Sequence, residues 1–318
     1  KFLIISLIVE VILGLLMGGY FLYFQKSPET SQVVTPKPKP KAVVAPEKVT
    51  FIIGGDAMMG RAVADQFNNN ITLAFENLTQ GMFGGKDIGI INLEGPINIT
   101  PNPTPDNLVF NFPRNSIDAL KYLGVNAVSL ANNHSRNQGK TGLEITQSLL
   151  KENNIIPIGE QMNYGLERFG SGKKKLSVIT INQLDDHQDI SQVIKDEKTA
   201  GNWVLVFPHW GGEYQEDSHS QSQESSAHSW IDAGADSVIF YSLGNLIFDQ
   251  TFSVPTQRGL ILSGEISEKE IKIQLMPTKI VHLRTELATG EEKQNIINKF
   301  KAELSNIAWN DDGFVLAQ

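Results

Sequence analysis

The sequence predicts an α/β fold, and three observations support that prediction. From residue 49 onward, short apolar runs alternate with segments of helical periodicity, which is typical of α/β domains. The chain has 318 residues, 41% of them hydrophobic, which is enough for one large or two small domains with a sizeable core. Four of the apolar runs end in polar side chains, as strands do beside the ligand sites of open α/β sheets.

The first element in chain order is an apolar stretch. Residues 2–24 hold one charged side chain, Glu10, and a run of this length reaches the roughly 20 residues that cross a bilayer as a helix. A cleaved signal peptide is the alternative, but no small-residue cleavage site follows. We therefore predict a transmembrane anchor over residues 1–25 and a single-pass protein of the cell membrane.

A proline-rich spacer follows the anchor. Residues 27–49 hold five prolines and the alternation PKPKPK, so residues 26–48 are predicted to form an extended, semi-rigid linker. Residues 1–48 hold six of the 27 basic and three of the 35 acidic side chains, which leaves a net charge of −11 for the remainder. We expect an acidic, extracytoplasmic domain, and no nucleic-acid partner, because such a partner normally requires a basic face.

The chain contains no cysteine. Disulfides, cysteine nucleophiles and thiolate metal sites are therefore excluded. Any metal ion must be held by carboxylate, amide and imidazole groups.

Each of four predicted strands leads to a polar side chain. The run VTFIIGG leads to Asp56, DIGIIN to Glu94, NAVSLAN to Asn133 and His134, and WVLVFP to His209. In open α/β sheets, ligands bind in the crevice beyond the carboxyl ends of the strands. We therefore expect these side chains to converge on one crevice.

Helices are predicted between these strands and near the end of the chain. The periodicity indicates helices over residues 116–123 and 139–152. The spacing of apolar residues over 291–309 predicts an amphipathic helix, with apolar side chains on one face. We therefore divide the rest of the chain into a domain over residues 49–285 and a helical tail over residues 286–318.

The predicted crevice holds a donor set for a divalent cation. Two carboxylates, an amide carbonyl and an imidazole suit Mn, Fe, Zn or Mg. Each residue also has a structural interpretation: Asp56 could cap a helix, Asn133 could form an Asx-turn, and His209 could be a hydrogen-bonded core histidine. Four such residues at equivalent topological positions favour a site over these separate structural roles.

Six segments also carry a resemblance to a known protein family. In order they are GGDAMMGR (54–61), INLEGPI (91–97), LGVNAVSLANNHSRNQGKTGL (123–143), FPHWGGEY (207–214), IDAGADSVI (231–239) and FYSLGNLIFDQ (240–250). They resemble the CapA/PgsA family of capsule and poly-γ-glutamate synthesis proteins, within the calcineurin-like metallophosphoesterase superfamily. The resemblance spans roughly residues 49–266 and implies a four-layer α-β-β-α sandwich with a metal site built from loops.

The resemblance also implies roles for the site residues. Asp56, Glu94, Asn133 and His209 would be metal ligands around one or two divalent ions, which polarise a phosphoryl group and activate water. His134 would act as a general acid toward the leaving group, or else as a hydrogen-bond partner of the ligands.

The sequence departs from the family pattern at two places near the metal site, and Asn137 also stands where the family often has an aspartate. Met58 stands where phosphoesterases of the superfamily carry a histidine ligand, although methionine is usual in the CapA-like branch, and a thioether is a poor ligand for hard ions. Family members also carry a stretch containing G-x-H-P-H between the positions of Ile239 and Phe240, which are adjacent in this chain. Either the metal site is incomplete or a segment is missing from the sequence.

Three functions remain open on these grounds. The first is a membrane-anchored protein that assists capsule or poly-γ-glutamate synthesis or export, with membrane-bound synthase or export subunits as partners. The second is a metal-dependent phosphoesterase outside the cell that acts on a phosphoester or an anionic polymer. The third is a non-catalytic scaffold or binding module on the same fold.

Overall fold

A computed structural model describes residues 47–98, 108–184, 188–212, 219–236 and 240–317. The predicted anchor, residues 1–25, and all but the last two residues of the predicted linker lie outside the described residues. Over the ranges that are described, no helix is both long enough and apolar enough to cross a membrane. Pro46–Gln318 form one compact unit.

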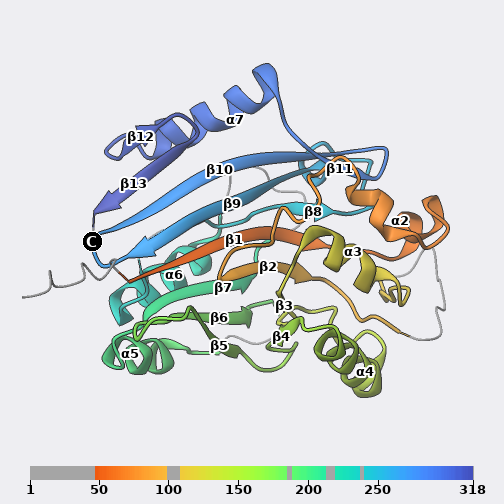
Figure 1. Ribbon diagram of the computed structural model, residues 1–318, viewed down its shortest axis with the longest axis horizontal. Helices are drawn as coiled ribbons and strands as arrows, with labels where there is room; N and C mark the ends of the chain where they lie inside the picture. Colours follow the sequence, from red (N-terminus) through yellow and green to blue (C-terminus); the bar gives the residue numbers. More distant parts are fainter. Residues whose placement is uncertain (1–46, 99–107, 185–187, 213–218, 237–239, 318) are drawn as a thin grey trace, which may run out of the picture. The chain divides into compact units, whose positions relative to one another are not determined.

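A large mixed sheet forms the centre of this unit (Figure 1). β1 pairs in parallel with β2, β2 with β3, and β3 with β4, whereas β9, β10, β13 and β12 continue the sheet in antiparallel pairs. Two short strands lie off this path, because β8 pairs with β1 and β11 pairs with β10. The strands in sheet order are β12 (Ala308–Asn310), β13 (Gly313–Ala317), β10 (Glu270–Val281), β9 (Arg258–Ser267), β1 (Lys48–Ala57), β2 (Ile88–Leu93), β3 (Ala127–Ser129) and β4 (Ile156–Ile158), with β8 (Asn245–Ile247) and β11 (Arg284–Leu287) beside them.

A smaller sheet and several helices complete the unit. β6 (Leu176–Asn182) pairs in antiparallel with β5 (Gly165–Phe169) and in parallel with β7 (Trp203–His209). The helices are α2 (Arg61–Gln66), α3 (Ser116–Leu123), α4 (Gly139–Glu152), α5 (Ser191–Thr199), α6 (Gln221–Ala233) and α7 (Gly290–Glu303), with two short 3-10 helices, η1 (Ile71–Phe75) and η2 (Pro255–Gln257).

Three apolar clusters separate the layers. Successive residues of a strand point to opposite faces, so each sheet contributes to two clusters. Ile91 of β2 packs toward the helices α3 and α4, whereas Ile90 packs toward the small sheet. On the small sheet, Val178 of β6 faces the large sheet, and Ile179 faces α5 and α6. The layers therefore run from helices through the large sheet and the small sheet to a second set of helices.

The mixed α/β fold predicted from the sequence is confirmed. The four predicted runs are strands β1, β2, β3 and β7, and the helices predicted over residues 116–123 and 139–152 are α3 and α4. The helical tail predicted over residues 286–318 is wrong in part, because α7 is the only helix among the described residues of that range. Residues 308–317 form β12 and β13, which join the large sheet beside β10.

Two glycines allow β1 to approach the segment before β8. The N–H of Asp56 donates to the carbonyl of Gly244 at 3.0 Å, and Gly244 has φ +61, a conformation that favours glycine. A Cβ atom on Gly55 would lie 1.9 Å from the Gly244 oxygen. The close contact holds Asp56 at the carboxyl end of β1.

Glu197 of α5 is a buried carboxylate that ties three elements together. Arg168 Nε donates to Glu197 Oε2 at 2.8 Å, and Arg168 Nη2 donates to Oε1. Ser177 Oγ and Asn202 Nδ2 donate to Oε2 at 2.6 and 2.9 Å. The bond from Arg168, followed by those from Ser177 and Asn202, outweighs burial and lowers the pKa of Glu197 from 4.5 to about 2.

This carboxylate should make the stability of the unit depend on pH. Since the folded-state pKa lies below the unfolded one, Glu197 contributes stability above about pH 4.5, and this contribution is lost as the pH falls toward 2. Glu197→Gln should therefore lower the free energy of unfolding at pH 7 by up to about 3 kcal/mol and flatten its acid dependence. Urea unfolding between pH 3 and 7 measures both effects. The exposed Glu152→Gln is the matched control, and an equal acid dependence in both variants would refute this assignment.

Candidate functional site

Asp56 and Glu94 lie at the ends of neighbouring parallel strands. Asp56 of β1 is in register with Asn92 of β2, and Asn92 Nδ2 donates to Asp56 Oδ1 at 2.8 Å. Glu94 follows β2 directly, and its N–H donates to the carbonyl of Ala57 at 3.1 Å. The side chain of Glu94 is 10% exposed and that of Asp56 is 31% exposed. The parallel pairing of β1 and β2 thus brings two predicted carboxylates to one edge of the sheet.

Asn133 and His134 lie in the turn that follows β3. Asn132 anchors this turn, because its Oδ1 accepts from the His134 N–H at 3.0 Å. Its Nδ2 donates to Asn92 Oδ1 at 3.0 Å and to the Leu93 carbonyl at 2.9 Å. The turn is therefore fixed to β2, beside the two carboxylates.

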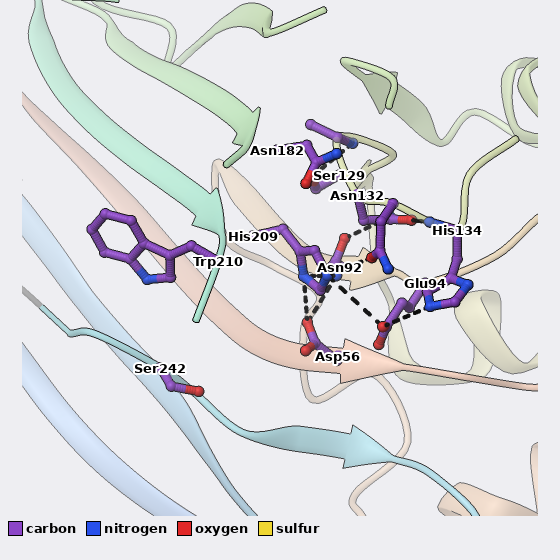
Figure 2. A network of polar contacts seen from close by, with 12 residues as sticks. Asp56, Asn92, Glu94, Ser129, Asn132, His134, Asn182, His209, Trp210 and Ser242 are labelled. Carbon is purple, nitrogen blue, oxygen red and sulfur yellow. Dashed lines mark hydrogen bonds and ion pairs between the residues drawn. The ribbon is translucent and has the colours of Figure 1, made fainter. Parts of the chain in front are cut away.

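His209, the last residue of β7, reaches from the small sheet to the large one (Figure 2). Its Nε2 lies 3.0 Å from Asn133 Oδ1 and 3.8 Å from Glu94 Oε1. Its Nδ1 lies 3.1 Å from Asn92 Nδ2 and 3.7 Å from Asp56 Oδ1. A single imidazole thus meets side chains from β1, from β2 and from the turn after β3.

His134 is held on the other side of Glu94. Its Nε2 lies 3.9 Å from Glu94 Oε1, and its Nδ1 lies 2.9 Å from Asn137 Oδ1. Its ring stacks on Phe110, with ring centroids 4.0 Å apart and an interplanar angle of 23°. The guanidinium of Arg61 lies 5.0 Å from the centre of the Phe110 ring. The orientation of the His134 ring is therefore fixed from two directions.

The hydrogen bonds determine which nitrogen carries the proton in the rings of His209 and His134. Asp56 accepts through its carboxylate oxygen, so the group of Asn92 that faces it is the NH₂, which can only donate to His209 Nδ1. His209 then carries its proton on Nε2 and donates it to Asn133 Oδ1. Both ring nitrogens of His209 are thus engaged in hydrogen bonds.

The tautomer of His134 follows in the same way. Asn137 Oδ1 accepts from the Phe110 N–H at 2.7 Å, so this atom is the carbonyl oxygen of the amide. His134 therefore donates from Nδ1 to Asn137. Its Nε2 faces Glu94, at 3.9 Å from Oε1.

The side chains fit a divalent cation in chemical type. Carboxylate and amide oxygens together with imidazole nitrogens are ligands for Mn, Fe, Zn or Mg. As they stand, no three of the described Asp, Glu and His side chains are grouped closely enough to hold a metal ion. Metal binding through His209 would therefore replace one of its hydrogen bonds to Asn92 or Asn133.

Sequence reasoning missed Asn92, which connects the site residues. It is 3% exposed and lies inside a strand that is buried along its whole length. A buried amide requires hydrogen-bond partners, so an asparagine in the otherwise apolar run IGIINL was the available signal. The structure thus adds a positioning residue to the predicted set.

The two departures from the family pattern have different outcomes. Met58 is fully buried, and its sulfur accepts from the Gly60 N–H at 3.3 Å, so it packs in the core instead of facing the site. The junction before Phe240 involves residues 237–239, which lie outside the described residues.

The fold and the site define a class of protein. It is an α/β domain in which side chains of types that suit a divalent cation meet at the carboxyl ends of the parallel strands. Its sequence matches the family described as bacterial capsule synthesis protein PGA_cap over residues 50–170 and 164–239. The chain belongs to this family, which confirms the resemblance found in the sequence, and all the predicted site residues lie within the matched span.

Two curated proteins are similar to this chain. The capsule biosynthesis protein CapA of Bacillus anthracis is 25% identical over 261 residues, which cover 68% of this chain and 63% of that protein. The PGA biosynthesis protein CapA of Bacillus subtilis (strain 168) is 24% identical over 303 residues, which cover 81% of this chain and 79% of that protein. The chain thus spans less than two thirds of the length of the first relative.

One solved structure is a distant neighbour. It is described as a novel phosphatase from Mycoplasma pneumoniae, is 13% identical, and covers 77% of this chain and 94% of its own, with a TM-score of 0.35. A likeness at that level supports no conclusion about the present chain.

Proposed function

We propose that this chain is a membrane-anchored, extracytoplasmic protein that assists the synthesis or export of capsule polymer or poly-γ-glutamate. The family match and the names of the two CapA relatives support the association with capsule. The apolar stretch over residues 2–24 and the PKPKPK linker support attachment to the membrane. Its partners are then the membrane and membrane-bound synthase or export subunits.

We further propose that the site belongs to the calcineurin-like metallophosphoesterase type and binds a divalent cation and a phosphoester. The convergence of His209 with Asp56, Glu94 and Asn133 is the observation that carries this proposal, because these residues come from both sheets. The order of layers, with two sheets between two sets of helices, agrees with it.

Asp56, Glu94, Asn133 and His209 would hold the ion. A divalent cation there supplies polarisation of a phosphoryl oxygen and a bound water of lowered pKa. Asn92 orients both Asp56 and His209 through its amide nitrogen. Asn137 directs His134 Nε2 toward the same space, where that atom can hold a proton for the leaving oxygen.

The role in capsule synthesis is tested in cells. Deleting the gene should lower the yield or the chain length of surface polymer, and a gene copy that encodes His209→Ala should restore neither. His228, whose side chain is 63% exposed on α6, provides the matched control, so His228→Ala should restore both. Unchanged polymer in the deletion strain would refute the proposed function.

Hydrolysis of the phosphoester is a second candidate function, and the placement of His134 favours it. Asn137 orients the His134 ring so that its Nε2 lies beside Glu94, on the side of the proposed metal donors. A non-catalytic binding module remains the third possibility. Measurement of bound metal and of hydrolysis by the purified protein separates these two functions.

A further inference from the structure

A cavity of about 90 Å³ lies beside the proposed metal site, between β1, β7 and the segment before β8. Asp56 and His209 form part of its wall, so the cavity is continuous with the site. Trp210 and Ser242, which also line it, lie on one side of Asp56 and His209, and His134 lies on the other (Figure 2). The cavity therefore extends from the metal donors away from His134.

Apart from Asp56 and His209 at the proposed metal site, the residues that line the cavity are uncharged. Leu205, Phe207 and Leu262 contribute apolar side chains, and none of the described residues that line it is a lysine or an arginine. A second anionic group inside would lose its hydration without gaining a cationic partner. The chemistry of the walls therefore excludes a carboxylate or a second phosphate and favours a neutral group.

The volume limits the size of the occupant. A single water needs about 10–15 Å³ on the same scale, so the cavity holds roughly six to nine non-hydrogen atoms. A six-membered ring is of this size, and it has fewer rotatable bonds to immobilise on binding than an open chain of equal length.

The aromatic wall is fixed in place before any ligand arrives. Trp210 Nε1 donates to the carbonyl of Tyr241 at 2.7 Å. The Trp210 ring stacks on Trp230, with centroids 5.2 Å apart, and the Tyr241 ring stacks on His219, with centroids 3.9 Å apart. A wall that is already ordered loses little conformational freedom when a ligand binds.

We propose that this cavity binds the organic group of a phosphoester, and that this group is an uncharged six-membered ring. The inference rests on the proposed function, because the donors at Asp56 and His209 would fix the phosphoryl end at the cavity mouth. The ring then extends between β1 and β7, on the opposite side from His134. It is therefore the group that a phosphodiester retains, whereas the leaving group faces His134.

The test measures the binding of three phosphonates to the purified full chain in Mn²⁺. Phenylphosphonate should bind about tenfold or more tightly than methylphosphonate, because burial of the ring adds apolar contact. A ring that carries a carboxylate, 4-phosphonobenzoate, should lose this gain. Isothermal titration calorimetry gives each dissociation constant.

A variant in the cavity wall separates the cavity from the metal site. Ser242 lines the cavity and is exposed, so Ser242→Trp should fold, fill part of the cavity with its ring and abolish the preference for phenylphosphonate. The affinity for methylphosphonate, which does not enter the cavity, should change by less than about twofold. Ser225→Trp, on the exposed face of α6 and away from the cavity, is the matched control and should keep the preference.

The outcomes separate this inference from the proposed function. Equal affinities for all three phosphonates, with Mn²⁺ bound, would overturn the ring site and leave the metal site standing. If no phosphonate shows Mn²⁺-dependent binding, the proposed function fails, and saturation-transfer NMR with phenol then tests the cavity alone. A phenol signal that disappears in Ser242→Trp supports the cavity site, and an unchanged signal overturns it.

Discussion

Replacing His209 with alanine is expected to lower the Mn²⁺-dependent hydrolysis of bis(4-nitrophenyl) phosphate by about 1,000-fold or more. His209 is the only proposed ligand that the small sheet contributes, and its ring touches Asn133 and approaches both Asp56 and Glu94. Its loss removes a ligand and also the contact between the sheets at the site. Steady-state kinetics with saturating Mn²⁺ measures the effect.

The control for this experiment is His228→Ala, which removes an exposed imidazole on α6 and should keep the wild-type rate. A His209→Ala protein that is folded, as judged by circular dichroism, and as active as the wild type would contradict the assignment. A wild-type protein that binds Mn²⁺ but does not hydrolyse the diester would instead favour the non-catalytic function.

The second large effect is expected at Asn92, which is not itself a proposed metal ligand but orients two of them, Asp56 and His209. Asn92→Leu keeps the number and branching of the side-chain heavy atoms and removes the donors to Asp56 Oδ1 and His209 Nδ1. We expect the affinity for Mn²⁺ to fall by about 10- to 100-fold, which is typical when a hydrogen-bond partner of metal ligands is lost. Calorimetric titration of Mn²⁺ measures the change.

The matched control is Asn126→Leu. Asn126 precedes β3, at the opposite end from the site, and its Oδ1 accepts from the Gly89 N–H at 2.8 Å. This variant should lose stability but keep the metal affinity. If both variants lose stability equally and neither loses metal affinity, Asn92 has only a structural role.

Much of the fold could be predicted from the sequence because local patterns specify it. The runs that became β1, β2, β3 and β7 are apolar and short, and each is followed by a polar side chain. Because the carboxyl ends of parallel neighbours meet at one edge, the same pattern located Asp56, Glu94 and His134. The same rule also located His209, although His209 lies at the end of a strand of the second sheet.

The end of the chain shows where local pattern fails. Helical spacing of apolar residues suggested a helix to residue 309, but α7 ends at Glu303. Asn310 pairs with Gly313 across a two-residue turn, and Asp311 there has φ +51. β13 pairs with β10 and β12 pairs with β13, and this pairing stabilises both strands. The spacing of apolar residues carries no information about such a contact between segments distant in the sequence.

Prediction of the site from local sequence patterns has a similar limit. The donors could be predicted singly, but the hydrogen bonds that link them depend on the register between β1 and β2, which pairs Asp56 with Asn92. The cavity beside His209 arises from the approach of β7 to β1 and to the segment that holds Ser242. Neither feature has a local sequence signature.

The most direct test of the central claim is a titration of Mn²⁺ into the purified, metal-stripped full chain, compared with Asp56→Ala. We predict saturable binding of one or two ions by the wild type and a loss of affinity of about 100-fold or more in the variant. Asp118→Ala, which removes an exposed carboxylate from α3, should bind as the wild type does. Equal binding by the wild type and Asp56→Ala, or no saturable binding by either, would contradict a metal site at this edge of the sheet.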